Sequence, residues 1–261
     1  MRYLFIIVAL LFGGTAFAQA PAQFEKKEYN YAEGKVLPYR ILYPENYDKS
    51  KKYPLVLFLH GAGERGNDNE KQLVHGSKLF LDADNRKKFP AIVVFPQCPA
   101  NSFWASIKVD TSVRPRVLAF DYTAEANWPL TAANELVQRI SADEEVDLRR
   151  IYVAGLSMGG MGTFEMVYRY PDMFAAALPI CGGADLNSYS SWTGKTPFWI
   201  FHGDADPVVT VKLSRDAVEK LKSIKATVKY SEYPGVNHNS WDNAFAEPDF
   251  LKWMFGQKKK K

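Results

Sequence analysis

Short, continuously apolar runs recur along the chain. Runs of this kind that contain β-branched or aromatic residues are typical of strands buried on both faces of a sheet. They lie at residues 55–59, 91–95, 151–154, 174–180, 197–201 and 227–233. Ahead of them, two Tyr-rich segments at 24–31 and 36–43 flank residues 32–35, which predicts an antiparallel hairpin. The pattern therefore predicts a sheet of about eight strands.

Segments with a helical spacing of apolar residues lie between these runs. A further helix is expected over 158–170, where Pro171 ends it. Strands that alternate with helices predict an α/β fold, in which a mostly parallel sheet carries helices on both faces. No linker interrupts the pattern, so we expect residues 19–261 to form one domain. Two segments each have one apolar face: Leu130, Ala133, Val137 and Ile140 in the first, and Leu213, Ala217, Leu221 and Ile224 in the second.

The connection over residues 96–128 is longer than most and rich in aromatic residues. Long connections in compact domains are often binding loops or lids. We therefore expect this segment to lie near a functional site.

Residues 1–18 have the pattern of a secretory signal peptide. Arg2 precedes an apolar run over 4–12, and Ala16-Phe17-Ala18 supplies a small-x-small cleavage site. Residues 13–15, Gly-Gly-Thr, cut the run short of the roughly 20 apolar residues that a membrane-spanning helix needs. No cysteine follows the run, so no lipid anchor is expected after cleavage. The pattern predicts a protein secreted to the periplasm or the cell exterior.

Composition narrows the classes further. With 47% hydrophobic and 24% charged residues, disordered and fibrous chains are excluded. The net charge of +4 is small, and no nucleic-acid motif, phosphate-binding glycine loop or metal-ligand cluster stands out. Cys98 and Cys181 follow predicted strands about three spacings apart, each of ~4.8 Å, beyond the ~7 Å limit for a disulfide. We expect free, half-buried thiols.

The strongest chemical signal is a G-x-S-x-G sequence at residues 155–159, which directly follows one predicted strand and opens a helix. In that context Ser157 is expected on a sharp turn with its hydroxyl exposed, as a nucleophile. An oxyanion hole needs two amide donors, one usually from the residue after the nucleophile, here Met158. The second fits Ala62, in the loop after strand 55–59, with Gly63 as its alternative.

A serine nucleophile needs a histidine base and an acid that orients it. The chain has four histidines, and His238 lies in a loop just after the last predicted strand. We therefore predict His238 as the base, and His60 as a structural residue beneath its loop. Two aspartates lie between the serine and this histidine in a suitable loop. Asp206 is favoured over Asp204, because the following proline holds it extended.

With these residues in place, the chain resembles the α/β-hydrolases of the esterase-D, feruloyl-esterase and polyhydroxybutyrate-depolymerase-like group, often labelled predicted peptidases. The resemblance runs from about residue 39 to 255. It implies a single-domain, cofactor-free serine esterase with a triad of Ser157, Asp206 and His238. The motifs that carry it are YPENY at 43–47, LFLHGAGERG at 57–66, PQCP at 96–99, GLSMGG at 155–160 and HGDADPVV at 202–209.

Aromatic residues near the nucleophile are candidates for substrate contact. We expect Trp104 first, then Phe103, and Trp241 close to the base. The lid aromatics form either an apolar wall for an acyl group or a small core of the lid itself: Phe103, Trp104, Phe120, Tyr122 and Trp128. A secreted enzyme with aromatic residues near its nucleophile suits small-molecule or polysaccharide-linked esters as substrates, such as feruloyl or acetyl groups on plant xylan.

Two other functions stay open. A peptidase of the same fold would use the same triad, with Glu64 or Arg65 as a charged anchor for the substrate terminus; these side chains otherwise form an ion pair or loop hydrogen bonds. A non-catalytic carbohydrate-binding domain on a hydrolase scaffold is the second alternative, because a fold alone does not determine function.

Overall fold

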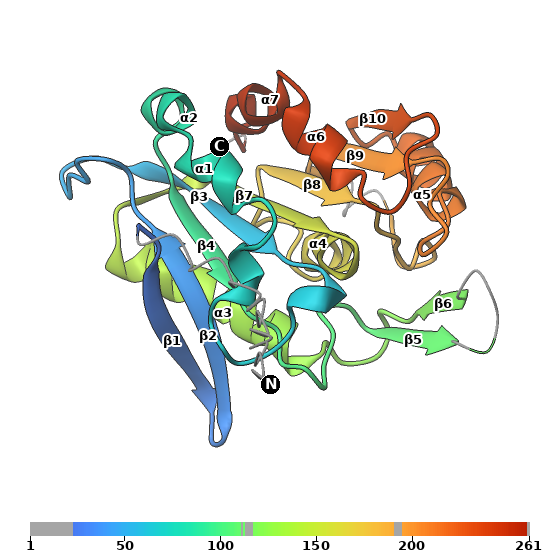
Figure 1. The fold of residues 1–261 in the computed structure, drawn as a ribbon, viewed down its shortest axis with the longest axis horizontal. Coiled ribbons are helices and arrows are strands. Elements are labelled where there is room, and N and C mark those ends of the chain that lie inside the picture. The colour runs from blue at the N-terminus through green and yellow to red at the C-terminus, as the bar shows by residue number, and fades with distance from the viewer. Residues whose placement is uncertain (1–22, 111, 113–116, 191–194, 260–261) are drawn as a thin grey trace, which may run out of the picture.

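The computed structural model describes residues 23–110, 112, 117–190 and 195–259, so the predicted signal peptide at 1–18 lies outside the described residues. The main sheet has eight strands in the order β1-β2-β4-β3-β7-β8-β9-β10 (Figure 1). β1 pairs antiparallel with β2, and β2 with β4, whereas every other neighbouring pair is parallel. The predicted mostly parallel sheet of the α/β-hydrolase type is confirmed. Its strands are β1 (Glu25–Ala32), β2 (Lys35–Leu42), β3 (Tyr53–Leu59), β4 (Ile92–Pro96), β7 (Val146–Leu156), β8 (Ala176–Ile180), β9 (Phe198–Gly203) and β10 (Val228–Tyr233).

The central strands are buried on both faces. Leu55, Leu57 and Leu59 of β3 pack into the core on one side of the sheet, and Val56 and Phe58 pack into the core on the other. Because successive side chains of a strand point to opposite faces, a strand covered on both sides must be apolar at every position. The continuous apolar runs in the sequence have this physical cause.

Helices cover both faces of the sheet, as predicted. Three of them pack on the side of Leu55: α3 (Trp128–Asp143), α4 (Met158–Arg169) and α5 (Lys212–Ser223). On the side of Val56 lie α1 (Ser77–Leu81), α6 (Trp241–Ala246) and α7 (Phe250–Gly256), with α2 (Ala83–Lys88) following α1. Two short 3-10 turns, η1 (Ala62–Glu64) and η2 (Lys71–Leu73), follow β3. In α3, all four predicted core residues are buried: Leu130, Ala133, Val137 and Ile140.

The segment predicted as a lid contains two short strands that the sequence analysis does not anticipate. β5 (Ile107–Asp110) and β6 (Val117–Phe120) pair antiparallel in a separate two-stranded sheet. Figure 1 shows this pair projecting from the body of the molecule. In β5, half-buried Ile107 and Val109 alternate with exposed Lys108 and Asp110, so the hairpin has one apolar face.

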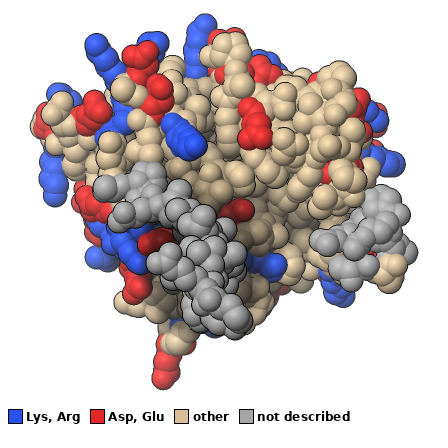
Figure 2. All heavy atoms as spheres, viewed as in Figure 1, with Lys and Arg blue, Asp and Glu red and all other residues tan. Residues whose placement is uncertain are grey.

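Both cysteines are free and fully buried, more deeply than expected. Among the described helices, none combines the length and the apolar character needed to cross a membrane. On the face that Figure 2 shows, basic and acidic side chains are interspersed around the periphery, and much of the middle that is not grey is uncharged.

Candidate active site

Ser157 lies at the turn between β7 and α4. Its backbone has φ 53° and ψ −117°, a conformation that non-glycine residues rarely adopt and that costs free energy. The Ser157 amide donates to the carbonyl oxygen of Ile180 in β8 at 2.8 Å, which fixes the turn against the sheet. The strained turn presents the hydroxyl at the start of a helix, as a nucleophile elbow requires.

Gly159 makes this turn possible. A Cβ atom at this position would lie 1.9 Å from the carbonyl oxygen of Leu59, at the end of β3. The helix that begins after Ser157 thus runs against the end of the neighbouring strand with no room for a side chain. The second glycine of the G-x-S-x-G sequence is therefore a packing requirement.

The structure brings Ser157, His238 and Asp206 together. The hydroxyl of Ser157 lies 2.9 Å from Nε2 of His238, and Nδ1 of that imidazole lies 2.7 Å from Oδ2 of Asp206. His238 comes from the loop between β10 and α6, and Asp206 from the turn after β9. Asp204 lies elsewhere in the same turn, where its carboxylate accepts the amide of Gly235 at 2.6 Å.

Four hydrogen bonds converge on the Asp206 carboxylate. Oδ1 accepts the amides of Val208 at 2.8 Å and Val209 at 2.9 Å, and Oδ2 accepts Nε2 of His202 at 3.2 Å besides His238. Burial acts to raise the pKa of Asp206, but the hydrogen bonds from His202, His238 and Val209 outweigh it and hold the pKa well below its usual value. Asp206 is therefore ionised, as an acid that orients a histidine must be.

The sequence analysis does not assign His202 to the site. It is fully buried, and its Nδ1 lies 2.7 Å from the Ser214 hydroxyl while Nε2 lies 2.9 Å from the carbonyl oxygen of Val209. Both neighbours of Nε2 are acceptors, so Nε2 carries the proton, which the Val209 carbonyl oxygen and Oδ2 of Asp206 share. The only sequence signal is its place at the end of β9, four residues before Asp206.

Met158 and Ala62 line the same cavity as Ser157 and His238. Met158 is the first residue of α4 and Ala62 the first of η1. Amides in the first turn of a helix have no acceptor within that helix, so the Met158 amide is available to an external anion. The two residues predicted as oxyanion donors therefore lie at the cavity of the nucleophile, and Gly63 lines it beside them.

The cavity above Ser157 has a volume of about 460 Å³. Phe103 and Trp241, the other two residues predicted to contact the substrate, line this cavity. Much of its apolar wall comes from the hairpin and its surroundings: Ile107, Val109, Leu118, Met161 and Val209.

The expectation that Trp104 contacts the substrate is wrong. Its side chain is fully buried and is not among the residues that line the cavity. The indole Nε1 donates to the carbonyl oxygen of His60 at 3.1 Å, and the ring packs against that imidazole. Trp104 is a core residue because its own hydrogen-bond donor is satisfied beneath the loop. Phe120, Tyr122 and Trp128 also lie outside the cavity wall, which favours their role in packing.

His60 is structural, as predicted. It is buried, and its Nε2 accepts the amide of Cys98 at 2.9 Å. Burial lowers the pKa of His60 to about 4, so the ring is neutral at neutral pH. It connects the loop after β3 to the loop after β4.

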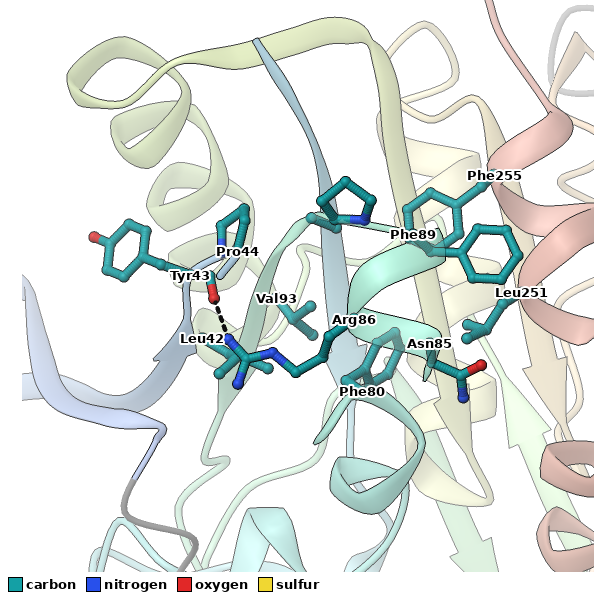
Figure 3. Close-up of a pocket in the computed structure, with 12 residues that line it drawn as sticks. Leu42, Tyr43, Pro44, Phe80, Asn85, Arg86, Phe89, Val93, Leu251 and Phe255 are labelled. Atoms are coloured by element: carbon teal, nitrogen blue, oxygen red, sulfur yellow. Dashed lines mark hydrogen bonds between the residues drawn. The ribbon is translucent and has the colours of Figure 1, made fainter. Parts of the chain in front are cut away.

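Two other features do not compete with this site. A hollow beside α2 and α7 has a volume of about 20 Å³, room for about one water molecule (Figure 3). Within the described part of the chain, one group has the spacing of metal ligands: Cys181, Asp206 and His238, whose ligand atoms lie within 4.8 Å of one another. Burial raises the pKa of the Cys181 thiol, so it stays protonated, and the other two side chains already bond to each other.

Comparisons with known proteins identify the family to which the chain belongs. Residues 34–245 match the Esterase family, described as "Putative esterase". A solved thermostable esterase is 35% identical, with a TM-score of 0.82; the match covers 91% of this chain, which spans 64% of that one. Acyl-protein thioesterase 1 of Neurospora crassa is 28% identical over 75% of this chain and 84% of its own. Feruloyl esterase B of Thermothelomyces thermophilus is 23% identical, over 83% of this chain and 80% of its own length. This chain therefore belongs to the Esterase family of α/β-hydrolases and is a carboxylic ester hydrolase.

Proposed function

We propose that the chain is a secreted serine carboxylesterase that works through an acyl-enzyme on Ser157. The observation that carries the proposal is the continuous chain of contacts from the Ser157 hydroxyl through His238 to Asp206, at 2.9 and 2.7 Å. A serine hydroxyl becomes a useful nucleophile only when a base takes its proton, and this arrangement supplies the base and its orienting acid.

In the proposed mechanism, Nε2 of His238 takes the proton from Ser157 as Oγ attacks the carbonyl carbon of the ester. The oxyanion receives hydrogen bonds from the amides of Met158 and Ala62, each worth about 3 kcal/mol of transition-state stabilisation. The C–O bond to the alcohol then breaks, and His238 donates its proton to the leaving alkoxide. The same imidazole then deprotonates water as it attacks the acyl carbon, and returns that proton to Oγ of Ser157 as the bond to the acyl group breaks and the acid leaves.

We propose small-molecule or polysaccharide-linked esters as substrates, with feruloyl or acetyl groups on plant polysaccharides as the first class to test. The apolar part of the cavity wall, with Ile107 and Val109 of β5 and Leu118 of β6, supports an apolar or aromatic acyl group. The similarity to a feruloyl esterase supports the same class. We also propose cleavage of the leader after Ala18, which N-terminal sequencing of the exported protein would check.

The test compares turnover of p-nitrophenyl acetate, methyl ferulate and an alanyl-p-nitroanilide by the wild type and Ser157→Ala. We expect hydrolysis of the two esters, little or no hydrolysis of the anilide, and loss of ester turnover in the variant. Preferred turnover of the anilide would favour the peptidase. Equal labelling of wild type and variant by a fluorophosphonate probe, without turnover, would favour the non-catalytic binding domain.

A further inference from the structure

We propose that Glu64 and Arg65 form a subsite for a leaving alcohol that carries several hydroxyl groups. The inference rests on the proposed esterase function and adds to it the residues that recognise the alcohol. Both side chains line the cavity that contains Ser157 and His238, and both follow Ala62 in the loop after β3. Neither has a part in the bond-making steps of the mechanism.

Glu64 offers its carboxylate to the cavity as a hydrogen-bond acceptor. Its side chain is only 14% exposed, and no hydrogen bond to its carboxylate forms among the described residues. Nε2 of His75 lies 3.8 Å from Oε1 of Glu64, which is too long for a hydrogen bond. Neither Glu64 oxygen is a fully buried atom without a partner, so the carboxylate is open to the cavity, where a hydroxyl group of a bound ligand can donate to it.

Arg65 is the complementary donor, and the structure holds it in place. Its Nε donates to the carbonyl oxygen of Ala62 at 3.0 Å and Nη1 to that of Ser102 at 3.1 Å, and the guanidinium lies 4.7 Å from the centroid of the Phe103 ring. An arginine carries five N–H donors, so these bonds leave several free. Glu64 and Arg65 do not form an ion pair with each other, and they present an acceptor beside a donor. Neighbouring hydroxyl groups of a sugar, which both donate and accept, match that pair.

Proton transfer fixes which part of the ester lies here. His238 must reach the oxygen of the leaving alcohol, so the alcohol lies on the side of His238. From that imidazole the cavity wall continues through Trp241, with ring centroids 5.5 Å apart, to His75 at 5.0 Å from Trp241, and then to Glu64. The apolar residues of the β5–β6 hairpin are left for the acyl group. The alcohol side thus combines an aromatic ring with polar groups, a surface suited to a sugar.

The experiment uses two esters that share an acetyl group and a primary alcohol on a six-membered ring: 6-O-acetylglucose, with hydroxyl groups, and cyclohexylmethyl acetate, without them. Wild type, Glu64→Ala and Glu64→Gln are compared by kcat and KM, with Glu70→Ala as a matched control. Glu70 lies on the same stretch, is exposed, and does not line the cavity. Acetylcholine is the third substrate, because its leaving alcohol is cationic and carries no further hydroxyl groups.

We expect the wild type to prefer 6-O-acetylglucose, and Glu64→Ala to lower its kcat/KM by about tenfold or more, mainly through KM, as loss of a hydrogen bond to a charged group implies. Glu64→Gln should lower kcat/KM for 6-O-acetylglucose by a smaller factor, because the glutamine side chain keeps a carbonyl acceptor. Cyclohexylmethyl acetate should change little in any variant, and Glu70→Ala should leave both esters unaffected.

An equal loss for both esters in Glu64→Ala would overturn the inference, since it would show that Glu64 only supports the oxyanion loop. An effect confined to acetylcholine would also overturn it, in favour of a cation subsite. Turnover of cyclohexylmethyl acetate with no preference and no effect of Glu64 rejects the subsite but leaves the esterase standing. Absence of turnover of every ester, with no fluorophosphonate labelling of Ser157, rejects both.

Discussion

The carboxylate of Asp206 accepts hydrogen bonds from two imidazoles, His238 at 2.7 Å and His202 at 3.2 Å, through the same oxygen Oδ2. The bond from His238 directs Nδ1–H toward the acid and leaves Nε2 free to face Ser157. The bond from His202, together with two backbone amides on Oδ1, prevents the carboxylate from rotating. Asp206 therefore acts on Ser157 only indirectly, by orienting His238.

This relationship predicts a ranking of variants. Asp206→Asn should lower kcat by roughly 10⁴, because the amide cannot hold the required tautomer of His238. His202→Asn should lower kcat by a much smaller factor, since three of the four hydrogen bonds to Asp206 remain. Asp216→Asn, at an exposed ion pair with Lys212, is the matched control. Initial rates with p-nitrophenyl acetate check the ranking, and a loss in His202→Asn as large as in Asp206→Asn contradicts it.

The lowered pKa of Asp206 also predicts a dependence of stability on pH. The folded-state pKa lies below the unfolded value of about 3.9, so ionised Asp206 stabilises the fold fully above about pH 4 and progressively less as the pH falls toward the folded pKa. Urea unfolding of wild type and Asp206→Asn from pH 7 to pH 3 measures this. The difference in unfolding free energy should be constant near neutrality and shrink below about pH 4. A difference that grows with acidity would contradict the assignment.

Gly159→Ala should destabilise the elbow severely. The added methyl group meets backbone at 1.9 Å, which cannot move aside as a flexible side chain would, so a loss of several kcal/mol of folding free energy and of most activity is expected. Gly256→Ala, at the end of α7 with open space around it, is the control and should change stability by less than about 1 kcal/mol. Thermal unfolding of both variants distinguishes close packing from a general intolerance of alanine.

A buried ion pair ties the hairpin to the helix of the nucleophile. Glu165 in α4 accepts the amide of Ser106 at 2.5 Å and pairs with Arg169 at 2.7 Å, and Arg169 also donates to the carbonyl oxygen of Ala124. Removing one partner leaves the charge of the other buried without a counter-charge, so Glu165→Gln should destabilise the fold by about 3 kcal/mol or more. The double variant Glu165→Gln with Arg169→Met should be less destabilised. Chemical unfolding that finds the double variant the worse of the two would contradict this role.

The part of the cavity wall formed by the β5–β6 hairpin predicts which acyl groups the enzyme prefers. Leu118 lines the cavity from β6, and Leu118→Ala enlarges the cavity that contains Ser157. Relative to acetate, p-nitrophenyl octanoate should gain in kcat/KM by a few-fold, since each buried CH₂ group contributes about 0.8 kcal/mol. Val117→Ala, at an exposed position on the same strand, is the control. An unchanged ratio of the two substrates in Leu118→Ala would place the acyl group elsewhere.

The sheet and the central residues of the site were predictable for physical reasons. A strand buried on both faces must be apolar throughout, and this marked β3, β4, β7 and β9 in the sequence. Ser157 was found because the elbow needs small residues on both sides within a strand-to-helix context. His238 and Asp206 followed from their places after the last strands, where the carboxyl ends of parallel strands meet.

The hairpin and the true cavity wall were not predictable. β5 and β6 have four residues each, too few for a pattern to stand out. Trp104 and Phe103 are neighbouring aromatic residues, and only the fold decides that Trp104 is buried against His60 while Phe103 lines the cavity. The role of His202 depends on a contact with Asp206 across a turn, and its place at a strand end, four residues before Asp206, does not by itself predict that contact.

The most direct test of the central claim is to trap the acyl-enzyme. The enzyme is mixed with p-nitrophenyl acetate, quenched rapidly in acid and digested, and the acetyl group is located by peptide mass spectrometry. We expect acetylation of the peptide that contains Ser157, at the hydroxyl of that residue, and none in Ser157→Ala. Acetylation of a different residue, or turnover by Ser157→Ala at the rate of the wild type, would contradict the account.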